Sequence, residues 1–233
     1  MKKVSLLTAL LVSAGITTAS ADLLMGGCPK AFQGFHLGAN IGYGIGYDKV
    51  KADDVPFGGG DTLNIKNKLG VSGVDGGIGT GYTFGCGNWR FGIAFDANWA
   101  NSSGTASHVE SDNEAYTYKS RLKNSLQLYG KTGYVICDKV MPFVGLGWEN
   151  AKWSRRLSVT NAAAVTTSFS SGKRINALMW KAGVDFLMTK HIIAGLEYTG
   201  SYGGRKSLEI TDDVSAKFKP QYNKFAATLR VIY

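Results

Sequence analysis

Residues Gly34 to Tyr47 read GFHLGANIGYGIGY, and apolar or aromatic side chains alternate there with small or polar ones. Successive side chains of an extended strand point to opposite faces, so the stretch predicts a strand with one apolar face and one face made mostly of glycine. The core of a soluble protein seldom takes so many tyrosines, because buried hydroxyl groups need partners. Lipid is therefore the favoured neighbour of the apolar face, which consists of Phe35, Leu37, Ala39, Ile41, Tyr43, Ile45 and Tyr47.

The N-terminus has the features of a secretory signal peptide. Met1, Lys2 and Lys3 form a positively charged start, residues 4–18 are an apolar stretch, and residues 19–21 read ASA, a small-residue cleavage site. We expect residues 1–21 to be removed and residues 22–233 to form one domain. Beyond Ala21 no window offers the ~18 apolar residues that a membrane helix requires.

The alternation of the first stretch recurs seven more times along the chain. The further stretches lie at residues 74–84, 89–99, 116–134, 144–148, 178–186, 192–199 and 224–233. An even number of strands suits an antiparallel sheet closed into a barrel in a bacterial outer membrane. The connections alternate in length, since 48–67, 101–115, 154–173 and 203–219 are long and 85–88, 136–141 and 188–191 are short. We predict that the long ones are extracellular loops and the short ones periplasmic turns.

The chain ends on alternating apolar residues and a terminal aromatic residue. The opening stretch, the eight-strand layout and the final ATLRVIY resemble the small opacity-protein and OmpA-like outer-membrane β-barrels over residues 32–233. The resemblance implies an all-β, eight-stranded antiparallel transmembrane barrel in the outer membrane. It also implies that the barrel assembly machinery recognises the C-terminal residues Phe225, Leu229, Val231 and Tyr233. It implies little about activity, because one fold hosts many functions.

Strand alternation places a set of charged side chains inside the predicted barrel. Eight strands enclose a space that side chains fill, and the glycines of the first strand would leave room for them. Because buried charges must be paired or hydrated, two interpretations stand: a structural ion-pair network that closes the lumen, or a narrow path whose basic excess favours anions. The residues are Asp75, Arg90, Asp96, Lys119, Arg121, Lys123, Lys131, Glu149, Lys181, Asp185, Glu197 and Arg230.

Basic residues gather around the third predicted loop, with no acidic residue between them. They are expected near the outer membrane boundary, where lipopolysaccharide presents phosphates, and guanidinium and ammonium groups suit phosphate oxygens. Our hypothesis is that they bind lipid phosphate or an acidic host polysaccharide. The alternative is a solvated basic loop that binds nothing in particular. The residues are Lys152, Arg155, Arg156, Lys173 and Arg174.

All three cysteines fall on the predicted periplasmic side, which is an oxidising compartment. Cys86 and Cys137 lie in turns separated by two strands, roughly 10 Å apart by strand spacing, which is beyond easy disulfide reach. The N-terminal lead that carries Cys28 can reach further. We therefore expect a Cys28–Cys86 disulfide.

Catalytic, cofactor and metal motifs do not stand out in the sequence. Ser107, His108, Glu110 and Ser111 are neighbours in one predicted loop, which is no substitute for the geometry of a catalytic triad. We expect a non-enzymatic protein without cofactors that has a structural or adhesin-like surface-interaction role, with a narrow porin-like channel as the alternative. The expected partners are outer-membrane lipid and lipopolysaccharide, the assembly machinery and host surface or matrix molecules. Nucleic acid is not expected, despite the net charge of +9.

Changing Tyr233 tests the C-terminal signal. Deleting Tyr233, or replacing it as Tyr233→Asp, should lower the amount of assembled barrel while export to the periplasm continues, because assembly and export read different segments. The measurement is the surface level of the protein beside its periplasmic level. Unchanged surface levels would show that the C-terminal residues are not the signal.

Overall fold

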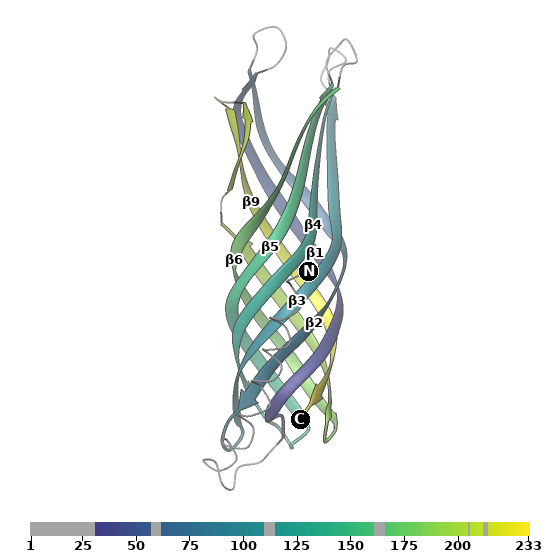
Figure 1. Ribbon diagram of the computed structural model, residues 1–233, viewed down its shortest axis with the longest axis vertical. Coiled ribbons are helices and arrows are strands. Elements are labelled where there is room, and N and C mark those ends of the chain that lie inside the picture. Colours follow the sequence, from purple (N-terminus) through teal and green to yellow (C-terminus); the bar gives the residue numbers. More distant parts are fainter. Residues whose placement is uncertain (1–30, 57–61, 110–114, 161–165, 205, 212–213) are drawn as a thin grey trace, which may run out of the picture.

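In the computed structural model, antiparallel strands wind into a closed, tall barrel (Figure 1). The structure describes residues 31–56, 62–109, 115–160, 166–204, 206–211 and 214–233. Each strand from β1 (Gly34–Pro56) to β7 (Ile192–Gly203) pairs with the next along the chain, β7 pairs with β9 (Val214–Ile232), and β9 pairs with β1. This last pairing closes the sheet. The strands between are β2 (Thr62–Phe84), β3 (Trp89–Val109), β4 (Ala115–Tyr134), β5 (Val140–Thr160) and β6 (Thr166–Thr189).

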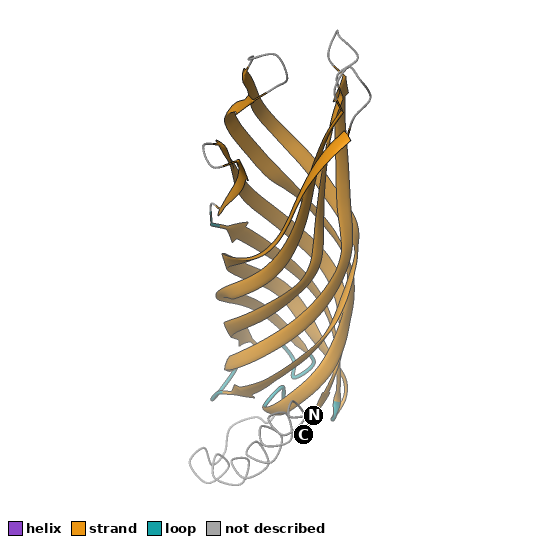
Figure 2. Cartoon of the chain, turned by 45° about the horizontal axis from the view of Figure 1, so that its top comes forward, coloured by secondary structure: helices purple, strands orange, loops and turns teal. Residues whose placement is uncertain are grey.

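The wall is eight strands around, as predicted. The short β8 (Lys206–Thr211) pairs only with β9 and begins where the pairing of β7 with β9 ends, so it extends β7 rather than adding a ninth position. Strands make up all the regular structure that Figure 2 colours. Within the described residues there is no helix with the length and hydropathy needed to cross a membrane.

The connections at one end of the barrel are the predicted short turns, whereas those at the other end differ from the predicted long loops. Short turns link β2 to β3, β4 to β5 and β6 to β7, as expected. Gly87 in the first of them has a φ of 59°, a left-handed conformation that glycine adopts without steric cost. The predicted long loops, in contrast, are mostly strand: β1 runs on to Pro56, β2 starts at Thr62, and β5 and β6 continue to Thr160 and from Thr166.

The strands are about twice as long as a membrane requires. A transmembrane β-strand needs about 9–11 residues, whereas β1 and β2 have 23 each. Large apolar side chains face outward only along the half nearer the short turns, with Ile45, Trp99, Trp148 and Leu178 at the upper limit. We call this outward surface the apolar band. The half beyond it stands outside the membrane, in water.

The apolar face changes sides where the strands leave the membrane. On β5, Trp148 faces outward and is 46% exposed, whereas Trp153, five residues further on, faces inward and is 3% exposed. On β2, Val74 faces outward, and Leu69 and Val71 face inward. The wall therefore has lipid outside it in one half and a hydrophobic core inside it in the other.

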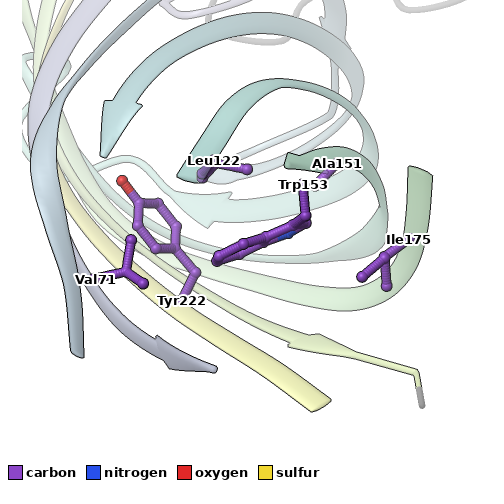
Figure 3. Close-up of a cluster of buried hydrophobic side chains, with 6 residues drawn as sticks. All are labelled: Val71, Leu122, Ala151, Trp153, Ile175 and Tyr222. Atoms are coloured by element: carbon purple, nitrogen blue, oxygen red, sulfur yellow. The ribbon is translucent and has the colours of Figure 1, made fainter. Parts of the chain in front are cut away.

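This upper core lies inside the barrel where the strands leave the membrane (Figure 3). The indole of Trp153 meets the ring of Tyr222 edge-on, with 6.5 Å between centroids. The Tyr222 hydroxyl lies 2.8 Å from Ser102 Oγ, so the buried phenol has a hydrogen-bond partner. Strands β2, β4, β5, β6 and β9 contribute the members, which are Val71, Leu122, Ala151, Trp153, Ile175 and Tyr222.

A bulge in β4 lets that strand change faces. Leu122 pairs with Trp153 and Asn124 pairs with Lys152, so two steps along β4 match one step along β5. The extra residue reverses the alternation of β4, as a β-bulge does. Leu122 and Tyr118 are consequently buried inside the barrel, although Leu126 and Leu128 at the same parity face lipid. Uninterrupted alternation through the predicted stretch 116–134 would place Tyr118 and Leu122 outward with Leu126 and Leu128, and the bulge makes that prediction wrong.

Truncating Trp153 tests the upper core. We expect Trp153→Ala to lower the free energy of unfolding by about 3–5 kcal/mol, because it empties the centre of a packed cluster. Ser154→Ala, one residue along and facing outward, should change it by less than about 0.5 kcal/mol. Urea unfolding in lipid vesicles measures both. Equal effects would mean that the upper half is not held together by this core.

Candidate functional site

Lys181 is the centre of an ion-pair network that fills the lumen at membrane level. Its Nζ lies 2.6 Å from Asp96 Oδ2 and 3.2 Å from Glu197 Oε1. The ammonium group also lies over the Tyr129 ring, 4.4 Å from the centroid. Two carboxylates and an aromatic face thus surround one cation that is 1% exposed. Burial of this kind is tolerated because each charge has a partner.

Arg230 extends the network toward the periplasmic end. Its Nη2 donates to Glu197 Oε2 at 2.9 Å, and its Nη1 donates to Asp185 Oδ1 at 2.7 Å. The second oxygen of Asp185 lies 3.6 Å from Lys131 Nζ. Lys181, Glu197, Arg230, Asp185 and Lys131 therefore alternate in charge along the lumen. With Asp96 on the other side of Lys181, the network holds three cations and three carboxylates, so neither sign is in excess.

Lys224 and Glu149 organise the upper part of the membrane-level lumen. Lys224 Nζ lies 3.0 Å from Asp75 Oδ1, and donates further hydrogen bonds to the side-chain oxygens of Asn40 and Asn98. Glu149 accepts hydrogen bonds from Gln127 Nε2 at 2.8 Å and from Ser201 Oγ. Amide and hydroxyl groups thus supply the hydrogen bonds that the ion pairs alone would not.

The glycines of β1 give these large side chains their room. Gly38 pairs with Arg230, and a Cβ at Gly38 would come within 2.6 Å of Arg230 Cγ. A Cβ at Gly44 would collide with the Tyr222 ring. The space serves side chains of the adjacent strand β9, so the glycine face is a packing requirement of the filled lumen.

A second polar cluster lies in the upper half, beside the hydrophobic core. Asp48 is fully buried, and Arg155 Nε donates to its Oδ2 at 2.6 Å. Tyr118 and Ser120 donate to the same carboxylate at 3.0 and 3.2 Å. Burial, followed by the charge of Asp48, raises the pKa of Tyr118 above its ordinary value, so its hydroxyl remains a donor. The Arg155 guanidinium also lies 4.5 Å from the Phe218 ring centroid.

The junction between the two halves of the lumen is tightly filled. A cavity there is lined by Glu149 and Ser201 on the membrane side and by Leu122, Trp153 and Tyr222 on the outer side. Its volume is about 10 Å³, room for about one water molecule. A cavity of this size does not hold a hydrated ion.

Nine of the twelve charged residues assigned to the lumen by alternation lie there. Arg90 is among them at the periplasmic end, where it donates to the backbone oxygens of Ala31, Gly87 and Trp89. Lys119, Arg121 and Lys123 are exposed on the outside, so their assignment to the lumen is wrong. The β4 bulge between Leu122 and Asn124 reverses the alternation on which it depended.

The predicted basic loop cluster is also divided by the wall. Arg155 faces the lumen and binds Asp48, so its assignment to an anion-binding surface is wrong. Lys173 is exposed, but it pairs with the inward-facing Trp153 and therefore lies on the inner side of the wall. Lys152, Arg156 and Arg174 face outward on β5 and β6. The cause is that residues 154–160 and 166–173 are strand, which sends alternate side chains to opposite faces.

Sequence reasoning missed Lys224 and Asp48. Both had a signal: Lys224 shares the inward parity of Arg230, and Asp48 continues the even-numbered inward face of β1. Asp48 was assigned to a loop, which hid its alternation. Gln127 and Tyr129 share the inward parity of Lys131, although no charge marks them as lumen residues, and Ser201 lies beyond the predicted stretch 192–199.

The cysteines and the C-terminal residues complete the periplasmic end. Cys86 is disulfide-bonded and Cys137 is free and exposed. Cys28 lies outside the described residues, so its pairing with Cys86 stays a prediction. The backbone N–H of Tyr233 donates to the Phe35 oxygen at 2.8 Å, joining the chain end to β1. The four proposed assembly residues, Phe225, Leu229, Val231 and Tyr233, are all exposed on the outer face.

A family model for the outer membrane protein beta-barrel domain matches residues 7–228. The chain belongs to this family. The protein is therefore a bacterial outer-membrane β-barrel, and the apolar band is the surface that meets the lipid. A comparison with curated protein sequences finds no match.

Solved outer-membrane proteins share the fold at low sequence identity. The outer membrane protease OmpT from Escherichia coli is 10% identical, with 86% of this chain and 97% of that chain covered and a TM-score of 0.53. OprG from Pseudomonas aeruginosa is 12% identical, with the same coverage and TM-score. Neisserial surface protein A is 15% identical, with 85% and 97% covered and a TM-score of 0.43. At these identities the similarity shows the fold alone.

Breaking one ion pair of this outer-membrane barrel tests whether the network is structural. Lys224→Met leaves the buried carboxylate of Asp75 without its cation and should lower the free energy of unfolding by about 3 kcal/mol. The double variant Lys224→Met/Asp75→Asn should recover about half of that loss, because it also removes the buried charge. Lys219→Met, exposed on the same strand, is the matched control. The measurement is urea unfolding in lipid vesicles. Equal losses of unfolding free energy in Lys224→Met and Lys219→Met would contradict a structural network.

Proposed function

We propose that this protein is a non-conducting outer-membrane barrel with a structural and surface-interaction role. The observation that carries the proposal is the packing of side chains across the lumen at two levels of the described barrel. Ion pairs around Lys181 and Arg230 occupy the membrane level, and the cluster around Trp153 and Tyr222 lies at the base of the outer half. With the interior filled, interactions with the surroundings fall to the outer surface.

The charge balance of the lumen argues against the alternative of an anion channel. That alternative rested on a basic excess, to which Lys119, Arg121 and Lys123 contributed, and these residues face outward. Six buried cations stand against six buried carboxylates among the described residues. They are Arg90, Lys131, Arg155, Lys181, Lys224 and Arg230 against Asp48, Asp75, Asp96, Glu149, Asp185 and Glu197.

Two observations support a role without catalysis. Ser107 Oγ lies 3.1 Å from Thr117 Oγ1 across the pairing of β3 with β4, which makes it part of a strand ladder. Glu110 and Ser111, its suggested companions, lie outside the described residues. In the part of the chain that the structure describes, no group of three His, Cys, Asp or Glu residues is placed to hold a metal ion.

The tall outer half supports a role at the cell surface. It is held by its own core and by the Asp48 cluster, so it stands beyond the membrane as a stiff continuation of the barrel. Hairpins on a rigid scaffold are the usual place for recognition residues. Outer-membrane lipid and host surface or matrix molecules are the partners that such a position favours.

Conductance and adhesion measured together test this function. The parent protein in planar bilayers should show no discrete conductance, with a known porin in the same bilayers as the positive control. Cells that display the protein should bind host cells or matrix more than cells without it, and cells expressing Tyr233→Asp at low surface level are the matched control. Conductance without adhesion would reject the proposal in favour of the channel.

A further inference from the structure

Charges are sorted by sign across the wall of the outer half. Above the apolar band, every outward-facing charged side chain whose orientation the structure describes is basic. Every carboxylate of the wall whose orientation the structure describes faces the lumen. We call the outward set the basic collar. It consists of Lys49, Lys68, Lys119, Arg121, Lys123, Lys152, Arg156, Arg174, Lys217 and Lys219.

The collar is densest on the face formed by β4, β5 and β6. Asn124, Lys152 and Arg174 occupy one row across the three strands, and Lys119 and Arg156 pair in a row above it. Neighbouring strands are about 4.8 Å apart, so adjacent cations can reach the same anion. The bulge adds Lys123 to this face, and six of the ten collar residues lie on it.

Two guanidinium groups of this face have uncharged hydrogen-bond acceptors. Arg121 Nη2 donates to Asn101 Oδ1 at 2.6 Å, and Arg174 Nη1 donates to Asn150 Oδ1 at 2.7 Å. These acceptors are neutral amides, which orient a guanidinium group without cancelling its charge. Residues 117–128, 150–158 and 168–178 contain no Asp or Glu. The face therefore presents oriented positive charge to whatever lies beside the barrel.

The height of the face identifies the anion. Lys152 is four residues beyond Trp148, the last outward aromatic residue of the apolar band on β5. At ~3.3 Å per residue and a strand tilt of ~40°, that is about 10 Å above the band's edge. Lipid headgroups occupy this level beside the wall, whereas a soluble polysaccharide would meet the tips of the hairpins first.

We propose that the β4–β6 face of the basic collar binds the phosphate groups of the outer-leaflet lipid. Acyl chains would lie against the apolar band while the phosphates bind Lys123, Lys152 and the oriented Arg174. Guanidinium and ammonium groups form charge-assisted hydrogen bonds with phosphate oxygens, and several together hold the anion better than one. This site does not depend on whether the barrel conducts ions or mediates adhesion.

Lipid binding by the purified, folded barrel in detergent tests the site. The probes are lipid A with its phosphates and the same lipid after dephosphorylation. Lys123→Gln/Lys152→Gln should bind phosphorylated lipid A at least about tenfold more weakly than the parent, since each cation near an anionic surface contributes about fivefold. Lys139→Gln/Lys190→Gln removes the same charge from the periplasmic turns and should bind as the parent does. A heat-modifiable gel shift checks that each variant is folded.

Two outcomes would overturn the proposal. One is that the parent binds dephosphorylated lipid as tightly as lipid A, a comparison that needs no variant. The other is that Lys123→Gln/Lys152→Gln binds lipid A like the parent but loses binding to heparin, which would assign the face to acidic polysaccharide. The proposal is supported if the collar variant alone binds lipid A more weakly than the parent does. Added salt should also weaken lipid A binding by the parent, because salt screens the attraction between exposed charges.

Discussion

The structure depends on one constraint: the apolar side of the wall must face lipid within the membrane and the interior beyond it. Within the membrane the outside is hydrocarbon, and eight strands leave a narrow lumen. Paired polar side chains and glycine fill it, together with a small buried cluster of Ala94, Tyr129 and Met179. Beyond the membrane the outside is water, so the interior becomes the place to bury Trp153, Tyr222 and Leu122. Each strand must therefore exchange its faces within a few residues.

Strands make this exchange in two ways, and both have consequences at the outer surface. On β5 the sequence itself changes parity, from the outward Trp148 to the inward Trp153. On β4 the apolar parity stays constant and a bulge between Leu122 and Asn124 reverses the backbone. The same extra residue that sends Leu122 into the upper core sends Lys123 to the outside. The contributions of β4 to the core of the outer half and to the basic outer face are thus two results of one backbone feature.

Alternation could predict the closed barrel and much of its lumen, because regular strands obey it. Lys181, Arg230 and Glu197 were found this way. It failed for Lys119, Arg121 and Lys123, because a bulge leaves no mark in the alternation of β4. It failed for Arg155 because polar strands in water resemble loops, and residues 154–160 contain too few apolar side chains to indicate a strand. The Asp48–Arg155 pair, between residues distant in sequence, could not follow from parity alone.

The sorting of charge follows from the cost of burying it. Six carboxylates inside the barrel each need a nearby cation or hydrogen-bond donor, because an unpaired buried charge destabilises the fold by several kcal/mol. The buried cations of the lumen match these carboxylates in number, with Lys181, Lys224 and Arg230 among them. Most of the remaining basic strand residues of described orientation face outward. Hydrocarbon excludes them from the apolar band, which leaves the rim above it. Among the strand residues whose orientation the structure describes, the basic excess thus lies mainly at the barrel's outer rim and not in its buried interior.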